Sequence, residues 1–223
     1  MDSVIRWPLT PKFYNPRTDS FMQSTSFLTR GTGRILTLLL VLTFTSATLA
    51  EDNPRVNLVT SEGLIEIELL PKFAPKHVAN FLALVEEGIY VGLVFHRVIP
   101  NFMIQAGGYD AELTYRPRDG QVDNESFNGL RNKRYAVSMA RLSDPDSADT
   151  QFFINVRDNP HLDAQPGEPG YTVFGRVVSG MDVIETIELT DTHLRMGMAA
   201  VPEKAIVILA TELQQWPMPS DCE

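Results

Sequence analysis

The stretch FHRVIPNFMIQAGG, residues 95–108, places a guanidinium and a primary amide among large hydrophobic side chains. Arg97 and Gln105 are costly to bury unless they find hydrogen-bond partners, which makes a sealed core an unsuitable place for them. Because side chains alternate along an extended chain, Met103 and Gln105 share one face of a strand that follows the break at Pro100. Phe102 lies next to that turn and can close one end. The stretch therefore predicts a lined pocket with an apolar floor and donors above it.

A second stretch, residues 151–156, repeats this combination of an amide and an aromatic ring. Gln151 and Phe153 share one face of the predicted strand, whereas Phe152 and Ile154 share the face that suits a core. The amide and the aromatic ring again lie together on the non-core face. We therefore expect the two stretches to form two sides of one groove.

The rest of the chain alternates or runs apolar over several more segments, which predicts many strands and two helices. Strands are expected at 55–60 and 64–70, paired as a hairpin, and at 135–140, 171–178 and 205–211. A helix begins near Pro75, a residue suited to a first turn, and stops at Gly88; a second, shorter helix covers 181–187. Residues 109–123 and 160–170 are expected to be loops. Many antiparallel strands with only two helices predict a mainly β fold, a closed barrel capped at its ends.

Charge and composition exclude several kinds of function. The chain has 19 basic and 28 acidic residues, and residues 51–223 alone carry 14 basic and 26 acidic ones. This acidic balance argues against sequence-independent binding of nucleic acid, which needs a cationic face. The single cysteine, Cys222, cannot form an intrachain disulfide or a thiolate metal cluster. The four histidines are scattered without metal-ligand spacing, so we expect no metal and no cofactor.

The first 50 residues have the features of a secretory leader. Arg30 and Arg34 precede a Leu-rich uncharged run at 35–47, and small residues lie just before Glu51. This order of positive charge, apolar run and small residues predicts a signal peptide cut near Ala50. We therefore divide the chain into a leader (1–50), one domain (51–215) and a C-terminal tail (216–223).

Two alternatives concern this leader. A start at Met22 would give a more ordinary leader of 29 residues and would leave residues 1–21 outside the protein. An uncleaved membrane anchor is the other alternative, but about 16 mostly apolar residues fall short of the roughly 20 needed to span a bilayer. We therefore expect no stable membrane insertion after cleavage.

The chain carries, in order, the motifs FHRVIP (95–100), FMIQ (102–105), GG (107–108), SMA (138–140), QFFI (151–154) and VFG (173–175). Together these resemble the cyclophilin family of peptidyl-prolyl cis-trans isomerases, from about Val56 to Leu209. NKR (132–134), MAR (139–141), DSA (146–148) and GYTVFG (170–175) are most similar to its bacterial periplasmic branch. The resemblance implies an eight-stranded antiparallel barrel closed by two helices.

The resemblance also implies site residues. Those implied for catalysis are Arg97, Gln105 and Phe102. Those implied for binding the substrate or lining its pocket are Met103, Ala140, Arg141, Gln151, Phe153, His161, Leu162 and Tyr171. Many eukaryotic relatives have a histidine at the place of Tyr171. His161 stands where those relatives carry the tryptophan associated with cyclosporin binding, so we expect weak cyclosporin binding.

The implied activity suits these side chains. The X-Pro bond has a rotation barrier of about 18–20 kcal/mol because the nitrogen lone pair is shared with the carbonyl. A guanidinium near the prolyl nitrogen favours the twisted bond, so neither a nucleophile nor a metal is needed. We expect a monomeric isomerase that helps exported proteins to fold in the periplasm. The alternative is a proline-peptide binding chaperone module with little catalysis, and the presence of Arg97 favours the enzyme.

Overall fold

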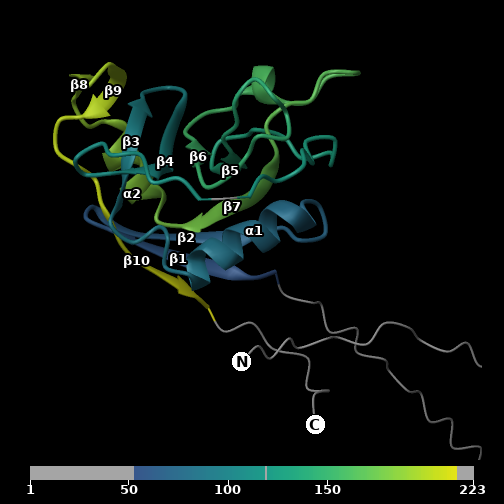
Figure 1. The fold of residues 1–223 in the computed structure, drawn as a ribbon, viewed down its shortest axis with the longest axis horizontal. Coiled ribbons are helices and arrows are strands. Elements are labelled where there is room, and N and C mark those ends of the chain that lie inside the picture. Colours follow the sequence, from purple (N-terminus) through teal and green to yellow (C-terminus); the bar gives the residue numbers. More distant parts are fainter. Residues whose placement is uncertain (1–52, 119, 215–223) are drawn as a thin grey trace, which may run out of the picture. The chain divides into compact units, whose positions relative to one another are not determined.

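The computed structural model describes residues 53–118 and 120–214 (Figure 1). The expected leader, Cys222 and the tail at 216–223 lie outside the described residues, so the predictions made for them stay predictions. Within the described part of the chain, no helix is both long enough and apolar enough to cross a membrane.

Eight strands form one antiparallel sheet in the order β10-β1-β2-β7-β5-β6-β4-β3. They are β1 (Arg55–Thr60), β2 (Gly63–Leu69), β3 (Leu93–Ile99), β4 (Met103–Asp110), β5 (Ala136–Met139), β6 (Phe152–Asn155), β7 (Val173–Ser179) and β10 (Ile208–Leu213). The two edges of the sheet meet where β3 contacts the segment that leads into β10: Val94 bridges to Val207, and Phe95 N donates to Ile206 O at 2.9 Å. The sheet is thus a nearly closed barrel (Figure 1), which confirms the predicted fold class.

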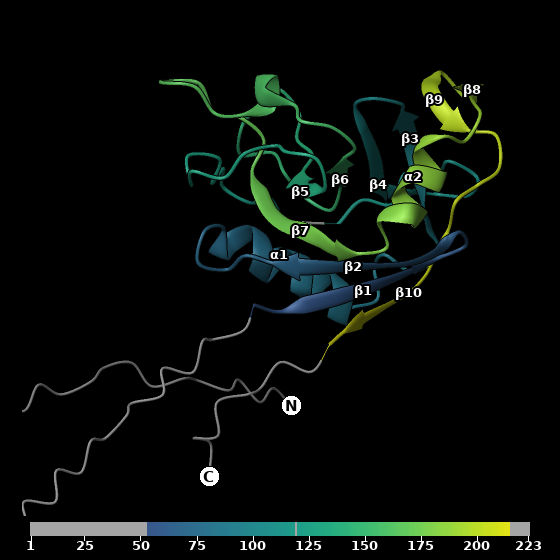
Figure 2. The ribbon, with the colours of Figure 1, turned by 180° about the vertical axis from the view of Figure 1, so that it is seen from behind.

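Two helices, α1 (Pro75–Glu86) and α2 (Met181–Glu188), cover the barrel (Figures 1 and 2). Helix α1 contacts β7 and β10, whereas α2 contacts β2, β3 and β4. Each helix turns an apolar stripe inward: Phe81 and Leu84 of α1, and Ile184 and Ile187 of α2, are fully buried in one core cluster with the strands. The prediction of two capping helices is confirmed.

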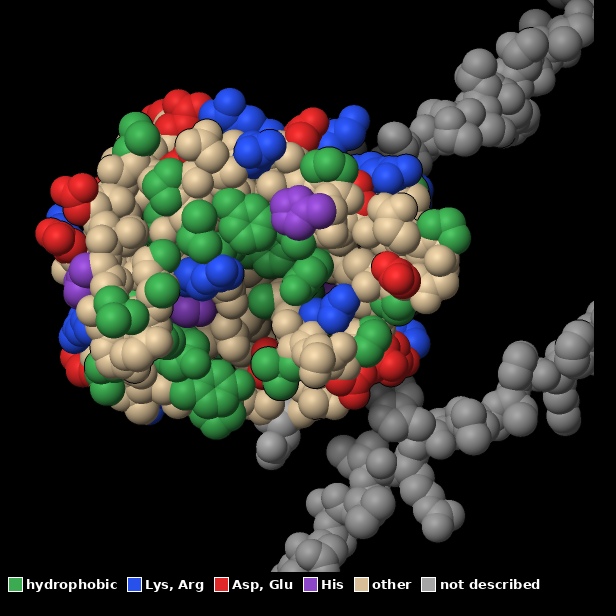
Figure 3. Space-filling model, turned by 90° about the horizontal axis from the view of Figure 1, so that it is seen from above, with side chains coloured by type: hydrophobic (Ala, Val, Ile, Leu, Met, Phe, Trp, Pro, Cys, Tyr) green, Lys and Arg blue, Asp and Glu red, His purple; other side chains and the backbone are tan. Residues whose placement is uncertain are grey.

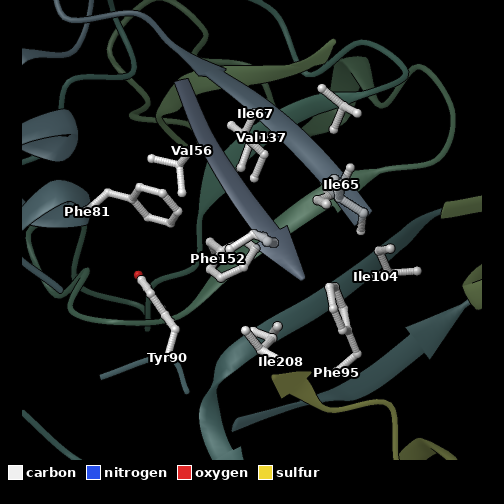
Figure 4. Close-up of a cluster of buried hydrophobic side chains, with 14 of the residues drawn as sticks. Val56, Ile65, Ile67, Phe81, Tyr90, Phe95, Ile104, Val137, Phe152 and Ile208 are labelled. Atoms are coloured by element: carbon white, nitrogen blue, oxygen red, sulfur yellow. The ribbon is translucent and has the colours of Figure 1, made fainter. Parts of the chain in front are cut away.

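The ring of Phe152 lies at the centre of this core (Figure 4). Phe81 and Tyr90 meet it edge to face, with ring centroids 5.6 and 5.4 Å away, a geometry that aromatic pairs favour. The Tyr90 hydroxyl donates to Thr150 O at 2.9 Å. Phe152 of β6 therefore points into the core. Because side chains alternate along a strand, its neighbour Phe153 points to the other side.

Several boundaries differ from the sequence-based ones. Strand β5 begins at Ala136 rather than Tyr135, because Tyr135 has a φ of +68°, in the left-handed region and far from the extended values of a regular strand. The last strand begins at Ile208 rather than at residue 205, and the loop predicted at 160–170 contains a 3-10 turn, η1 (Pro160–Leu162). A separate hairpin, β8 (Thr192–Arg195) and β9 (Met198–Pro202), was not predicted.

Candidate active site

A cavity of about 260 Å³ lies where β3, β4 and β6 meet the loops after β5 and η1. Nine of the eleven predicted site residues line it: Arg97, Phe102, Met103, Gln105, Ala140, Arg141, Phe153, Leu162 and Tyr171. The other two lie against its wall. Gln151 Oε1 accepts from Gln105 Nε2 at 3.0 Å, and the ring of His161 stacks on Phe102 with centroids 5.5 Å apart. The fold thus brings all eleven to one place.

Met103 and Phe153 form the apolar floor. They are 2 % and 4 % exposed, and they lie outside the core cluster that fills the barrel. The β4–β6 register places Gln105 opposite Phe153, so the faces that carry the two amides lie on the same side of the sheet. Tyr171 meets Phe153 edge to face at 5.6 Å. The result is an apolar surface made of aromatic rings and a thioether.

A line of polar groups runs above this floor. Strand register pairs Arg97 with Gln105, and Arg97 Nη1 donates to Gln105 Oε1 at 3.3 Å. The amide nitrogen of Gln105 then donates to Gln151. A Cβ on Gly108 would lie 2.6 Å from Gln151 Cδ, so glycine is needed there for the Gln151 side chain to lie close. These contacts fix the side chain of Gln105 from both sides.

Arg141 forms part of a side wall. Its guanidinium donates to three carbonyl oxygens: Nε to Gly170 at 3.2 Å, Nη1 to Leu142 at 2.9 Å and Nη2 to Pro169 at 2.9 Å. It also lies 4.7 Å above the centroid of the Tyr171 ring, within the range of a cation–π contact. The planar group is therefore held in one orientation beside the floor.

Beneath the pocket lies a buried polar network that the sequence analysis missed. Asn159 Nδ2 donates to Phe102 O and to Asn155 Oδ1, both at 2.8 Å, and Asn159 O accepts from Leu162 N at 3.0 Å. Asn132 Nδ2 donates to Tyr171 O at 3.4 Å. The network thus holds the backbone of three wall residues.

The same network is closed by two further contacts. Asn132 N donates to Asp163 Oδ1 at 2.7 Å, and Ser138 Oγ donates to Asn132 Oδ1 at the same distance. One feature of the sequence could have indicated this network: Asn155 ends an apolar strand, and a buried amide needs hydrogen-bond partners.

His96, next to Arg97 in the chain, is 4 % exposed and lies 4.8 Å from the ring of Tyr109. Burial lowers the pKa of His96 to about 4, because the charged ring loses its hydration. The imidazole is therefore neutral near pH 7. Among residues 53–118 and 120–214, no group of three or more His, Cys, Asp or Glu side chains is placed to hold a metal ion.

Comparisons with known proteins agree with this geometry. The family model described as "Cyclophilin type peptidyl-prolyl cis-trans isomerase/CLD" matches residues 55–213. Peptidyl-prolyl cis-trans isomerase A of Dickeya dadantii is 44% identical over 179 residues, which cover 80% of this chain and 94% of that protein. Peptidyl-prolyl cis-trans isomerase cyp18 of Streptomyces antibioticus is 46% identical over 161 residues, which cover 71% and 97%.

Among solved structures, a cyclophilin type peptidyl-prolyl cis-trans isomerase of Cryptosporidium parvum matches with a TM-score of 0.60 and 27% identity. The match covers 74% of this chain and 99% of that one. The resemblance found in the sequence motifs is thereby confirmed. This chain belongs to the cyclophilin-type peptidyl-prolyl cis-trans isomerase family, and its activity is the isomerisation of X-Pro peptide bonds.

Proposed function

We propose that this isomerase acts as a monomer on exported proteins in the periplasm and that Arg97 is its catalytic group. The proposal that the protein is exported rests on the order of basic, apolar and small residues in 1–50. Exported chains contain X-Pro bonds whose uncatalysed isomerisation takes tens of seconds or longer, so an isomerase there removes a slow folding step. Sequencing the mature protein from a periplasmic extract should find Glu51 at its N-terminus; a membrane-bound chain that retains residues 35–47 would contradict this.

The proposed catalytic role of Arg97 rests on its position. Arg97 lies beside Gln105 and lines the pocket whose floor is formed by Met103 and Phe153. In a planar X-Pro bond the nitrogen lone pair is conjugated with the carbonyl and is a poor acceptor. As the bond twists, conjugation is lost and the lone pair can accept an N–H from the guanidinium. This hydrogen bond exists in the transition state and not in either planar state, so it lowers the barrier.

The remaining residues hold the substrate while the bond turns. The apolar floor takes the proline ring, which has no N–H to satisfy. Gln105 and Gln151 offer amide donors and acceptors to the peptide backbone beside it. With the ring and one side of the chain held, rotation is confined to the other side, and the entropy of orientation is removed before the chemical step.

Arg97→Ala tests this mechanism. Removing one donor that acts mainly in the transition state is expected to lower kcat/KM by about a hundredfold, measured by NMR exchange or protease-coupled kinetics on an X-Pro peptide. Arg157→Ala is the matched control, because Arg157 is exposed, does not line the pocket and donates to Asp158 O. Equal rates for wild type and Arg97→Ala would reject the mechanism. Peptide binding by a wild type that gives no rate enhancement would instead favour the chaperone module.

We also propose weak binding of cyclosporin. His161, whose ring is stacked on Phe102, stands where eukaryotic relatives carry the tryptophan associated with cyclosporin binding. Replacing it by His161→Trp should strengthen inhibition of the isomerase by the drug. Nanomolar inhibition of the wild type would contradict this expectation.

A further inference from the structure

The cavity carries an uneven distribution of charge. Two guanidinium groups, Arg97 and Arg141, line it, and no Asp or Glu side chain among the described residues does. This is unexpected in a chain whose formal net charge is −9. The other lining side chains are apolar or neutral. In the space-filling view of Figure 3, hydrophobic side chains gather at the centre of the face with basic and histidine side chains among them, while acidic side chains lie mostly toward its margin.

Arg141 is held in place without being neutralised. Its three hydrogen bonds go to carbonyl oxygens, and its fourth contact is the face of Tyr171. Several other arginines of the domain pair with a carboxylate instead, as Arg134 does with Glu185 at 2.8 Å. Neither Arg97 nor Arg141 takes part in any of the ion pairs found among the described residues.

The acidic loop that follows Arg141 uses its carboxylates for its own structure. Asp144 Oδ1 accepts from Asp146 N at 3.0 Å, and Asp146 Oδ1 accepts from Asn124 N at 2.7 Å. Asp149 accepts from the Tyr115 hydroxyl at 3.0 Å and from Thr150 N at 2.6 Å. These bonds hold the loop, and none of them places a carboxylate on the Arg141 guanidinium.

We propose that the groove prefers substrate segments with a carboxylate side chain next to the proline, and that Arg141 determines this preference. The proposal rests on the isomerase function of the groove and adds the charge of its substrates. A guanidinium that is already oriented loses little entropy when a carboxylate approaches, and it can hold that carboxylate through two donors. A lysine side chain at the same place would meet two positive charges. Charge on the peptide therefore changes kcat/KM chiefly through binding.

The test compares peptides that differ only in charge. Glu, Gln or Lys is placed either directly before or directly after the proline, and kcat/KM is measured by NMR exchange at low salt and at 1 M salt. For at least one of the two positions, the Glu peptide should exceed the Lys peptide by about fivefold at low salt, the size expected of partly exposed charge pairs. The ratio should shrink at about 1 M salt, where screening reaches roughly 3 Å.

Variants of Arg141 separate charge from structure. Arg141→Gln should at least halve the Glu-to-Lys ratio, whereas Arg141→Lys, which keeps the charge but not the three-carbonyl geometry, should retain most of it. Arg157→Gln is the control for loss of one positive charge outside the pocket and should leave the ratio unchanged. Because the readout is a ratio between peptides, a general loss of stability or activity in a variant does not imitate the result.

Each outcome has a definite meaning. Equal kcat/KM for Glu, Gln and Lys peptides at both positions, with normal turnover of the Gln peptides, would overturn this inference and leave the isomerase function standing. A preference that survives unchanged in Arg141→Gln would overturn the role given to Arg141. Absence of catalysis on every peptide would instead overturn the proposed function.

Discussion

Gln105 joins the two halves of the groove that the sequence analysis recognised separately. Its carbonyl accepts from Arg97 and its amide nitrogen donates to Gln151, which lies 46 residues further along the chain. Both stretches were recognised because they combine polar groups with large apolar ones. Such groups need partners when they are enclosed, and here each becomes the partner of another. The unusual composition of each stretch thus has a single explanation in the structure.

The buried imidazole of His96 should make the stability of the folded protein depend on pH. Burial lowers its pKa to about 4 in the folded protein, while an unfolded chain has the ordinary value near 6.5. Between these values the unfolded state binds a proton that the folded state does not, so stability falls as the pH is lowered through this window. The expected loss from His96 is about 2 kcal/mol between pH 7 and pH 5, measured by urea unfolding.

The control for this prediction replaces an exposed histidine. His96→Gln should reduce the pH slope, whereas His161→Gln should preserve it. A residual slope is expected in His96→Gln because burial also lowers the pKa of His77. An unchanged slope in His96→Gln would show that His96 is not the group responsible.

At the scale of elements, the pocket is held by the way loops attach to strands. The turn before β4, the 3-10 turn η1 and the segment before β7 are separate in sequence, yet two asparagines bond to all three. Asn159 bonds to the turn through its side chain and to η1 through its backbone oxygen, and the side chain of Asn132 bonds to Tyr171 O. Glu125 likewise bonds to a segment that is distant in sequence, the start of helix α1. It accepts from Lys76 N at 3.1 Å and from His77 N at 3.0 Å, and so caps helix α1, which has no side-chain cap from its own first residues.

Asn159→Ala tests the network. The change leaves the amide oxygen of Asn155 without its donor, and it leaves the carbonyl of Phe102 with Val156 N as its remaining donor, at 3.2 Å. Unsatisfied buried groups of this kind cost about 1–3 kcal/mol each. We expect a lower free energy of unfolding and a raised KM, because Phe102 at the end of the pocket loses the shorter of the two hydrogen bonds to its carbonyl.

Asn128→Ala is the matched control for Asn159→Ala. It removes two side-chain hydrogen bonds from a half-buried residue that does not line the pocket: Nδ2 donates to Val173 O and Oδ1 accepts from Leu130 N, both at 3.0 Å. It should lower stability while KM stays near the wild-type value. Equal changes in KM for the two variants would show that the network does not position the pocket.

At the scale of the whole molecule, one core supports both the barrel and the groove. Phe152 is fully buried against rings from α1 and the following loop, while its neighbour Phe153 lines the cavity. Strand β6 therefore transmits the packing of the core directly to the floor of the site. One face of the strand packs in the core and the other lines the cavity.

Phe152→Ala should therefore lower the free energy of unfolding by about 3–5 kcal/mol, the usual cost of emptying a buried aromatic site. Phe127→Ala is the control, because Phe127 is 62% exposed and its loss should change stability by less than about 0.5 kcal/mol. Both values can be measured by chemical denaturation. Similar losses for the two variants would contradict the central place given to Phe152.

Elements with strong periodicity were predictable, and those without it were not. The hairpin β1–β2 and both helices followed from alternation or helical spacing over at least six residues. The hairpin β8–β9 was missed because its strands have four and five residues and most of their side chains are partly or fully exposed. Burial, which creates a hydrophobic pattern, is weak in that hairpin.

The sequence alone determined the fold class and the two stretches that make the pocket, because local alternation records which side chains share a face. The other residues that line the pocket came from the resemblance of the motifs to the cyclophilin family. Only the tertiary structure decided how those faces are joined and charged. The bonds of Asn159 to Phe102, of Glu125 to helix α1 and of Arg141 to three carbonyls link segments or orient groups in space. A hydrogen-bond partner is chosen by distance and direction after folding, and neither is written in the local pattern of residues.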